Sequence, residues 1–427
     1  MNCNQALEKI QKGTLDACLC ALYGEAALPM QRTRYTDAIR AFAVRFGQAR
    51  EITLFSVPGR SELCGNHTDH NGGLALAATV DTDIIAVAAP CDTHTVTVLS
   101  QGYGEERVKL DAFFAPRPDR YACSDALIAG IARGFADAGY NTGGFDAYTT
   151  SNVPKGSGLS SSAAFEIMVG TIQNAFYNES RIDAVTLAQI AQYAENEFFG
   201  KPCGLLDQLS IATGGICALD FAVPQVPRVK KVDFDMTAAD YALCIVNTGG
   251  DHADLTADYA AVPAEMRAVA KELGGAVLCD VEETDLIQRL AHLRALVGDR
   301  ALLRALHFFA ENRRVDEQVK ALSTGDLLRF LSLVTQSGRS SFQYLQNVYA
   351  PTHPHQQGIS LALCLAERFL CDKKGACRVH GGGFAGTVQI ILPQKHVPAL
   401  RELMDGTFGA GACTALRIRA QGPVILQ

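Results

Sequence analysis

The sequence of 427 residues predicts an α+β protein built from two domains. Runs rich in β-branched and aromatic residues, which are typical of strands, occur among stretches in which apolar residues recur with the helical period. The length corresponds to about 2.8 units of 150 residues, and two domains is the expectation for such a chain. We place the boundary near residue 220, with a first domain of residues 1–220 and a second of residues 221–427.

The first domain begins with a helical extension and continues with strands. Residues 1–45 contain Ala, Leu and mixed charges with a single proline, which favours helices. Four β-rich runs follow, the first of which ends at Pro58-Gly59. They cover residues 52–57, 76–80, 84–89 and 95–99.

Helices complete the first domain and recur in the second. An apolar helical face is formed by Ala164, Met168, Ile172, Ala175 and Phe176. A second helix over residues 185–199 is ended by Gly200-Lys201-Pro202. In the second domain we expect a long helical region over residues 284–348 and a strand over residues 387–392 that Pro393 ends.

Composition excludes several classes of protein. The 38 Lys and Arg residues against 45 Asp and Glu residues give a net charge of −7 without a basic block, which argues against nucleic-acid binding. An apolar fraction of 48% argues against disorder, and no run approaches the roughly 18 apolar residues of a membrane helix. The N-terminus lacks a signal pattern, and the 14 cysteines include no Cys-x-x-Cys pair. We therefore expect a cytoplasmic protein with free thiols, by default a monomer, without a membrane partner.

The segment from Pro154 to Ala163, which opens the helix with the apolar face, combines two glycines with three consecutive serines. Glycines let the backbone approach a ligand closely, and a helix start offers free amides, hydroxyls and a positive dipole end. These features suit phosphate binding, although no Walker motif is present. The competing interpretation is a serine N-cap after a glycine turn.

The segment of residues 58–73 places Arg60 and a run of polar side chains from Asn66 to Asn71 between glycines. An Arg fork can hold a carboxylate or phosphate, and the polar run can hydrogen-bond several hydroxyls of a polyol. A metal site at His67 and His70, or a plain polar turn, are the alternatives.

Two further segments carry possible site residues. Residues 379–387 contain four glycines directly before a strand, which predicts either a backbone surface pressed against something or a structural bend. Residues 194–208 include Asp207, which lies among apolar and small residues. A buried Asp is costly unless it is paired, so Asp207 is either a site residue or an N-cap.

Together the four segments resemble the galactokinases of the GHMP small-molecule kinase superfamily. Residues 59–71 are similar to the family signature Gly-Arg-Val-Asn-Leu-Ile-Gly-Glu-His-Thr-Asp-Tyr-Asn, and residues 154–163 to the family phosphate loop. Residues 194–208 are similar to the family segment that ends in Cys-Gly-Ile-Met-Asp-Gln. Residues 381–386 are similar to the family segment Gly-Gly-Gly-Phe-Gly-Gly, with Ala385 in place of one glycine. The resemblance implies a two-domain fold of mixed sheets and packed helices, with the active site in the cleft between the domains. It also implies transfer of phosphate from ATP to the anomeric hydroxyl of galactose.

The resemblance also implies roles for individual residues. Asp207 is the expected catalytic carboxylate, with Arg60 beside it to keep it ionised. Mg²⁺ is expected at Ser161 and Glu195. The expected ATP-binding residues are Lys155, Gly156, Ser157, Gly158, Leu159, Ser160, Ser161 and Ser162. The expected sugar-binding residues are Asn66, His67, Asp69, His70, Gly204 and Tyr259.

The sequence departs from the family pattern at the sugar signature. Asn66 replaces a Glu that contacts the sugar near its C6 hydroxyl, and His70 replaces a Tyr, as in plant galacturonate kinases. A uronic acid is therefore an alternative substrate. The Asn and Arg that follow the family Tyr are absent after Tyr259. A galactose sensor without turnover is a remote alternative, because Ser162-Ala163, Arg60 and Asp207 are all present.

Overall fold

The computed structural model describes residues 1–112, 115–154, 156–250 and 255–426. Its larger sheet has eight strands in the order β12-β1-β2-β5-β3-β4, with β6 pairing β2 and β7 pairing β6. All pairs are antiparallel except β3 with β5. The strands are β1 (Thr53–Cys64), β2 (Leu74–Pro90), β3 (Thr95–Ser100), β4 (Glu105–Lys109), β5 (Phe145–Ser151), β6 (Ile216–Asp220), β7 (Arg228–Val232) and β12 (Val424–Leu426).

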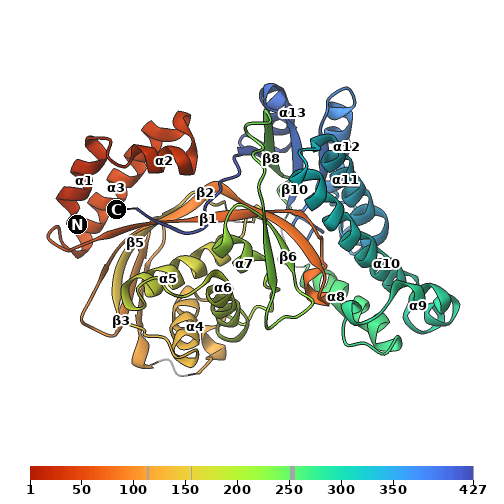
Figure 1. Ribbon diagram of the computed structural model, residues 1–427, viewed down its shortest axis with the longest axis horizontal. Helices are drawn as coiled ribbons and strands as arrows, with labels where there is room; N and C mark the ends of the chain where they lie inside the picture. The colour runs from red at the N-terminus through yellow and green to blue at the C-terminus, as the bar shows by residue number, and fades with distance from the viewer. Residues whose placement is uncertain (113–114, 155, 251–254, 427) are drawn as a thin grey trace.

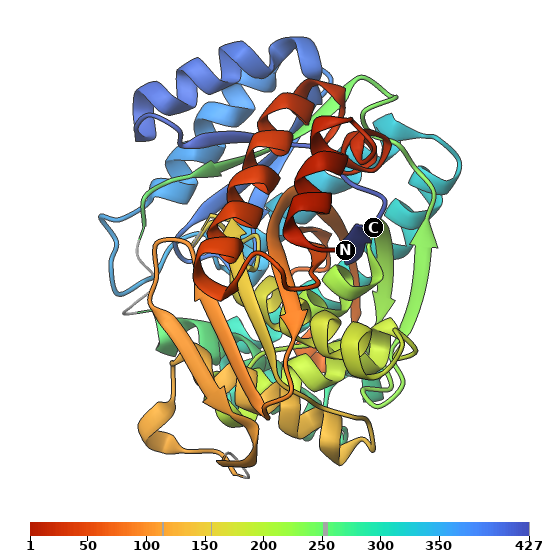
Figure 2. The same cartoon turned by 90° about the vertical axis from the view of Figure 1, so that its left-hand side faces the viewer.

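Helices cover both faces of this sheet because its strands are apolar on both sides (Figures 1 and 2). Leu54 and Val87 face the N-terminal helices, whereas their neighbours Phe55 and Ala86 face the opposite helical layer. The N-terminal layer is α1 (Cys3–Gln11), α2 (Asp16–Tyr23) and α3 (Leu28–Phe46). The opposite layer is α4 (Ser124–Asp137), α5 (Ser161–Tyr177), α6 (Ala184–Tyr193) and α7 (Leu206–Thr213). The helical extension thus has a packing role.

The smaller sheet has the antiparallel order β11-β8-β10-β9. Its strands are β8 (Tyr241–Asn247), β9 (Ala376–His380), β10 (Thr387–Pro393) and β11 (Cys413–Leu416). Cys244 and Val246 pack on α12 (Gly358–Leu370) and α13 (Val397–Phe408). Leu243 and Ile245 point to the other face and join the core of the larger sheet.

The remaining helices lie on the side of the molecule away from the N-terminal helices (Figure 1). They are α8 (Thr256–Glu272), α9 (Glu283–Gln288), α10 (Leu290–Ser323) and α11 (Leu327–Ser340). The long α10 is kinked at Gly298, whose φ is 81°. Val315 and Leu331 pack in the same core cluster as Phe55 and Ile167, so the two halves of the chain share buried apolar surface.

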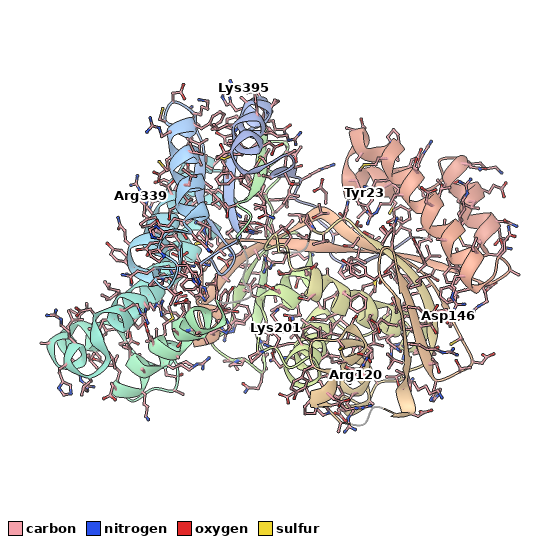
Figure 3. The ribbon with its side chains drawn as sticks, turned by 180° about the vertical axis from the view of Figure 1, so that it is seen from behind. Tyr23, Arg120, Asp146, Lys201, Arg339 and Lys395 are labelled. Atoms are coloured by element: carbon pink, nitrogen blue, oxygen red, sulfur yellow. The ribbon has the colours of Figure 1, made fainter. Side chains whose placement is uncertain are left out.

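The expected helices and strands are present, with two differences. β1 does not stop at Pro58-Gly59 but continues to Cys64, because bulges between Pro58 and Arg60 and between Glu62 and Cys64 absorb the irregularity. The runs 76–80 and 84–89 belong to one strand, β2. The polar stretch between them is stabilised inside the protein, where Asp83 accepts hydrogen bonds from Arg34 at 2.6 Å and from Tyr23 at 2.5 Å (Figure 3 labels Tyr23).

Two further properties concern the helices and the cysteines. Within the described residues, every helix is too short or too polar to cross a bilayer. All 14 cysteines are free thiols, and six of them are buried.

Candidate active site

Arg60 and Asp207 form the centre of the site. Arg60 lies at the bulge in β1, and Asp207 lies in the first turn of α7. Arg60 Nε donates to Asp207 Oδ1 at 2.8 Å, and the Asp207 side chain remains 35% exposed. Asp207 is not the N-cap of α7, a position that Leu205 occupies. The pairing expected from the sequence is therefore present, and the capping alternative is wrong.

The Asp207 carboxylate is ionised at neutral pH. Its burial opposes ionisation, but the charge of Arg60 and hydrogen bonds from Ser160 and Arg60 outweigh this effect and lower the pKa below its ordinary value. The N-terminal end of α7 also favours a negative charge there. A carboxylate held in this way can accept or orient a hydroxyl proton.

The glycine-rich loop between β5 and α5 is joined to this pair. Arg60 Nη1 donates to the Gly158 carbonyl, and Ser160 Oγ donates to Asp207 Oδ2. Gly156, Gly158 and Ser160 have positive φ of 68°, 69° and 59°. Ser160 occupies the N-cap position of α5, as the competing interpretation expected, but its hydroxyl makes no capping hydrogen bond to the helix. The expected phosphate-binding residue Lys155 lies outside the described residues.

A second carboxylate, Glu195, lies beside the start of α5. It belongs to a π-helical turn (Ala194–Phe198) that follows α6, and it is 2% exposed. Glu195 Oε1 accepts from Lys201 Nζ at 2.8 Å and from Ser162 Oγ at 3.4 Å (Figure 3 labels Lys201). Among the hydrogen bonds of the described residues, Ser162 rather than the expected Ser161 reaches Glu195.

Two buried residues behind Glu195 were missed by sequence reasoning. Gln208 Nε2 donates to Glu195 Oε2 at 2.8 Å and to Glu166 Oε2 at 3.0 Å. Burial, together with the charge of Glu195, raises the pKa of Glu166 well above its ordinary value. The helical spacing offered a signal, because Glu166 lies four residues after Ser162 and thus on the same face of α5.

A short turn after β1 carries the expected sugar-binding residues. Asp69 Oδ1 lies 3.6 Å from His70 Nε2. A Cβ atom at Gly204 would lie 1.8 Å from Asp69 Oδ2, so a larger residue there would displace the Asp69 carboxylate. The structure therefore brings the neighbouring residues Asp69 and His70 next to Gly204, which is far from them in the sequence.

His67 and Tyr259 meet at the glycine-rich segment 381–386. The His67 and Tyr259 ring centroids are 5.2 Å apart, and His67 Nε2 lies 2.8 Å from the Gly382 carbonyl oxygen. Burial lowers the pKa of His67 to about 3, so the ring is neutral and Nε2 is the donor. A Cβ atom at Gly382 would clash with the Tyr259 hydroxyl. This segment is thus a backbone surface pressed against side chains, as one of the two interpretations predicted.

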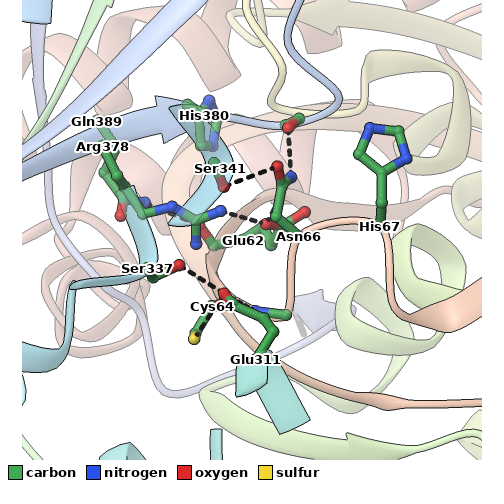
Figure 4. Close-up of polar contacts among 12 residues, drawn as sticks. Glu62, Cys64, Asn66, His67, Glu311, Ser337, Ser341, Arg378, His380 and Gln389 are labelled. Atoms are coloured by element: carbon green, nitrogen blue, oxygen red, sulfur yellow. Dashed lines mark hydrogen bonds and ion pairs between the residues drawn. The ribbon is translucent and has the colours of Figure 1, made fainter. Parts of the chain in front are cut away.

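Asn66 lies below this segment with its side chain inside the protein (Figure 4). Its Nδ2 donates to the Gly381 carbonyl at 2.7 Å and to Glu62 Oε1 at 3.2 Å. Its Oδ1 accepts from Asn347 Nδ2 at 2.7 Å and from Ser341 Oγ at 3.3 Å. The amide therefore has protein partners for both donors and both lone pairs, which is not the open sugar contact expected from the sequence.

Comparisons with known proteins show which proteins this chain is similar to. The family model of the GHMP kinases N terminal domain matches residues 126–215, and the galactokinase galactose-binding signature matches residues 40–90. A galactokinase of Mannheimia succiniciproducens is 30% identical over 375 residues, which cover 87% of this chain and 93% of the relative.

Solved structures share the fold. The Lactococcus lactis galactokinase complexed with galactose matches with a TM-score of 0.76 and 24% identity, over 90% of this chain and 98% of that chain. The mevalonate kinase of Methanococcus jannaschii matches with a TM-score of 0.60 and 15% identity, over 87% of this chain and 98% of that chain.

The fold and the joined carboxylate, arginine and glycine-rich loop define a small-molecule kinase of the GHMP superfamily. Within that superfamily, the 30% identity to the Mannheimia galactokinase over 87% of this chain identifies the family. The chain belongs to the galactokinase family.

Proposed function

We propose that this protein transfers the γ-phosphoryl group of ATP to the anomeric hydroxyl of galactose, which yields galactose 1-phosphate and ADP. The observation that carries the proposal is the contact of one ionised carboxylate, Asp207, with both Arg60 of the signature segment and Ser160 of the glycine-rich loop. A group that touches both segments can align an acceptor hydroxyl with a nucleotide phosphate.

In this mechanism the residues act mainly by position and charge. The Asp207 carboxylate accepts the hydrogen bond of the C1 hydroxyl and takes its proton as the new O–P bond forms and the bond to ADP breaks. Arg60 holds Asp207 ionised and stabilises charge that develops on the transferring group. Residues 156–162 offer backbone amides and hydroxyls to the phosphates of the nucleotide.

We further propose a Mg²⁺ site at Glu195 and Ser162, which replaces the Ser161 expected from the sequence. The donor set fits, because a buried carboxylate and a hydroxyl 3.4 Å apart supply the hard oxygen ligands that Mg²⁺ prefers. When bound, the ion neutralises charge on the phosphate oxygens. Lys201, which contacts Glu195 Oε1 in this structure, supplies a positive charge at the same carboxylate.

The sugar is proposed to lie against Asp69, His70, Gly204, His67 and Tyr259. The galacturonate alternative is not favoured, because the family match is to galactokinases and the Asn66 amide already has four protein partners. The sensor alternative is not favoured either, because Arg60, Asp207 and Ser162-Ala163 are all present.

Three broader features of the protein remain proposals. We expect it to work as a monomer, and in the cytoplasm, where a reducing environment suits 14 free thiols. We also expect the chain to divide near residue 220, between β6 and β7, although these two strands pair with each other.

A coupled assay of ADP release tests the proposed function. Purified protein is given Mg-ATP and, in turn, galactose, glucose and galacturonate, and the product is identified by phosphorus NMR. We expect rapid ADP release with galactose only, and an anomeric phosphate as the product. ADP release without sugar phosphate, or a preference for galacturonate, would contradict the proposal.

A further inference from the structure

Glu62 and Asn66 have exchanged residue types relative to the galactokinase signature. The signature quoted above has Asn at the position of Glu62 and Glu at the position of Asn66. In the structure these two residues are in contact, with Asn66 Nδ2 donating to Glu62 Oε1 at 3.2 Å. The pair therefore still has one carboxylate and one amide, but the negative charge lies at position 62 instead of position 66.

The charge in its new position is balanced by a buried cation. Arg378 Nη2 on β9 donates to Glu62 Oε1 at 2.8 Å, and its side chain is fully buried (Figure 4). The next carboxylate in the cluster, Glu311, is paired with Arg314 at 2.6 Å. A carboxylate at position 66 would add a second negative charge about 3 Å from Glu62, which already accepts the hydrogen bond of Arg378 Nη2.

The amide of Asn66 ties together parts of the chain that are distant in sequence. It contacts Gly381 in the glycine-rich segment and Asn347 in the loop after the π-helical turn (Ser341–Leu345). His67, the next residue, contacts Gly382 in the same segment. Moving the Asn66 side chain onto a ligand would leave buried polar groups without partners, which is unfavourable.

We propose that Asn66 is a positioning residue, fixed by Glu62 and Arg378, which holds the sugar-binding turn against segment 381–386 and does not contact the C6 hydroxyl of the sugar. It follows that the enzyme discriminates little between galactose and 6-deoxygalactose. This inference rests on the proposed function and specifies how its sugar site is built.

The first test compares the two sugars on the full-length protein. A site whose buried groups hydrogen-bond a substrate hydroxyl rejects the analogue that lacks it by about 10⁴–10⁵. We expect kcat/KM for 6-deoxygalactose within about tenfold of that for galactose. We also expect Asn66→Ala to raise KM for both sugars by the same factor, to within about threefold, while KM for ATP is unchanged. A preference for galactose that is large in the wild type and collapses in Asn66→Ala would overturn the proposal.

The second test uses isosteric variants to move the negative charge from residue 62 to residue 66. Asn66→Asp puts two buried carboxylates in contact, and we expect its kcat/KM for galactose to fall at least about 30-fold. Glu62→Gln combined with Asn66→Asp restores one negative charge but not the donor to Gly381, so we expect partial recovery, at least about tenfold above Asn66→Asp. Wild-type activity in Asn66→Asp, or no recovery in the double variant, would contradict the proposal.

Melting temperatures test the interaction between Glu62 and Asn66 without relying on enzyme activity. We expect the melting temperature to fall in each single variant and to recover in part in the double variant. The reason is that residues 62 and 66 interact directly through their charges inside the protein. Strictly additive shifts would contradict the Glu62–Asn66 unit even if galactose phosphorylation is normal. A wild-type protein without galactose-dependent ADP release would instead contradict the proposed function.

Discussion

Asp69 occupies the space that a side chain at residue 204 would need. Its Oδ2 lies 1.8 Å from the position of a Cβ atom on Gly204, and its carboxylate is 12% exposed. Because the two residues are 135 positions apart, their contact joins the turn after β1 to the loop before α7. The position of the carboxylate thus depends on the absence of a single methyl group.

Gly204→Ala therefore tests the sugar site. We expect the methyl group to displace Asp69 and to raise KM for galactose at least about 30-fold, with KM for ATP changed less than about threefold. Gly406→Ala in α13 is the matched control, because an added Cβ there would meet no atom of the described residues within 4 Å. Equal effects of the two variants on galactose would contradict the assignment of Asp69.

If Ser162 is the magnesium ligand, replacing Ser162 and replacing the adjacent Ser161 should affect the Mg²⁺ requirement differently. Ser162 Oγ lies 3.4 Å from Glu195 Oε1, so Ser162→Ala should raise the Mg²⁺ concentration for half-maximal activity by about tenfold. Ser161→Ala should change it little. Mn²⁺ binding in the presence of ADP, followed by electron paramagnetic resonance, gives a second readout. The reverse order of the two variants would restore the original expectation of Ser161.

Asp81 predicts a dependence of stability on pH. Burial raises its pKa from 3.8 to about 6, although it accepts a hydrogen bond from the Arg417 amide at 3.0 Å. The folded state therefore binds this proton more tightly than the unfolded state, and the free energy of unfolding falls as pH rises from about 4 through 6. The Asp81→Asn variant keeps a hydrogen-bond acceptor for the Arg417 amide, but it has no carboxyl group at this position whose titration lowers the free energy of unfolding.

The measurement for Asp81 is urea unfolding of the wild type and Asp81→Asn at pH 5 and pH 7.5. We expect the stability of the variant relative to the wild type to increase by about 1–2 kcal/mol between the two pH values. A difference that stays constant with pH would show that Asp81 does not titrate in this range.

Much of this fold follows from local patterns in the sequence. The helix α5 and the strand β10 agree with their apolar periodicity and with Pro393 as a stop. The single strand β2 was not predictable from apolar runs, because Asp83 interrupts them and is stabilised by Arg34 and Tyr23 of the N-terminal extension. Such partners lie 49 and 60 residues away and leave no local signal.

The site was predictable as a set of segments but less so as a set of contacts. Motifs identified Arg60 and Asp207, whose pairing the structure contains. The inward position of Asn66 depends on Asn347 and Gly381, which lie 281 and 315 residues away. The choice of Ser162 over Ser161 depends on the rotation of α5, which is fixed by packing rather than by the order of the serines.

Asp207→Asn tests the central claim most directly, because it removes the charge and the proton acceptor while keeping the shape of the side chain. We expect kcat for galactose phosphorylation to fall by roughly 10²–10³ or more, since the lost contact acts in the transition state. The Kd for ATP, measured by calorimetry, should stay within about threefold, and Asp69→Asn should instead raise KM for galactose. Near-normal turnover by Asp207→Asn would contradict the account.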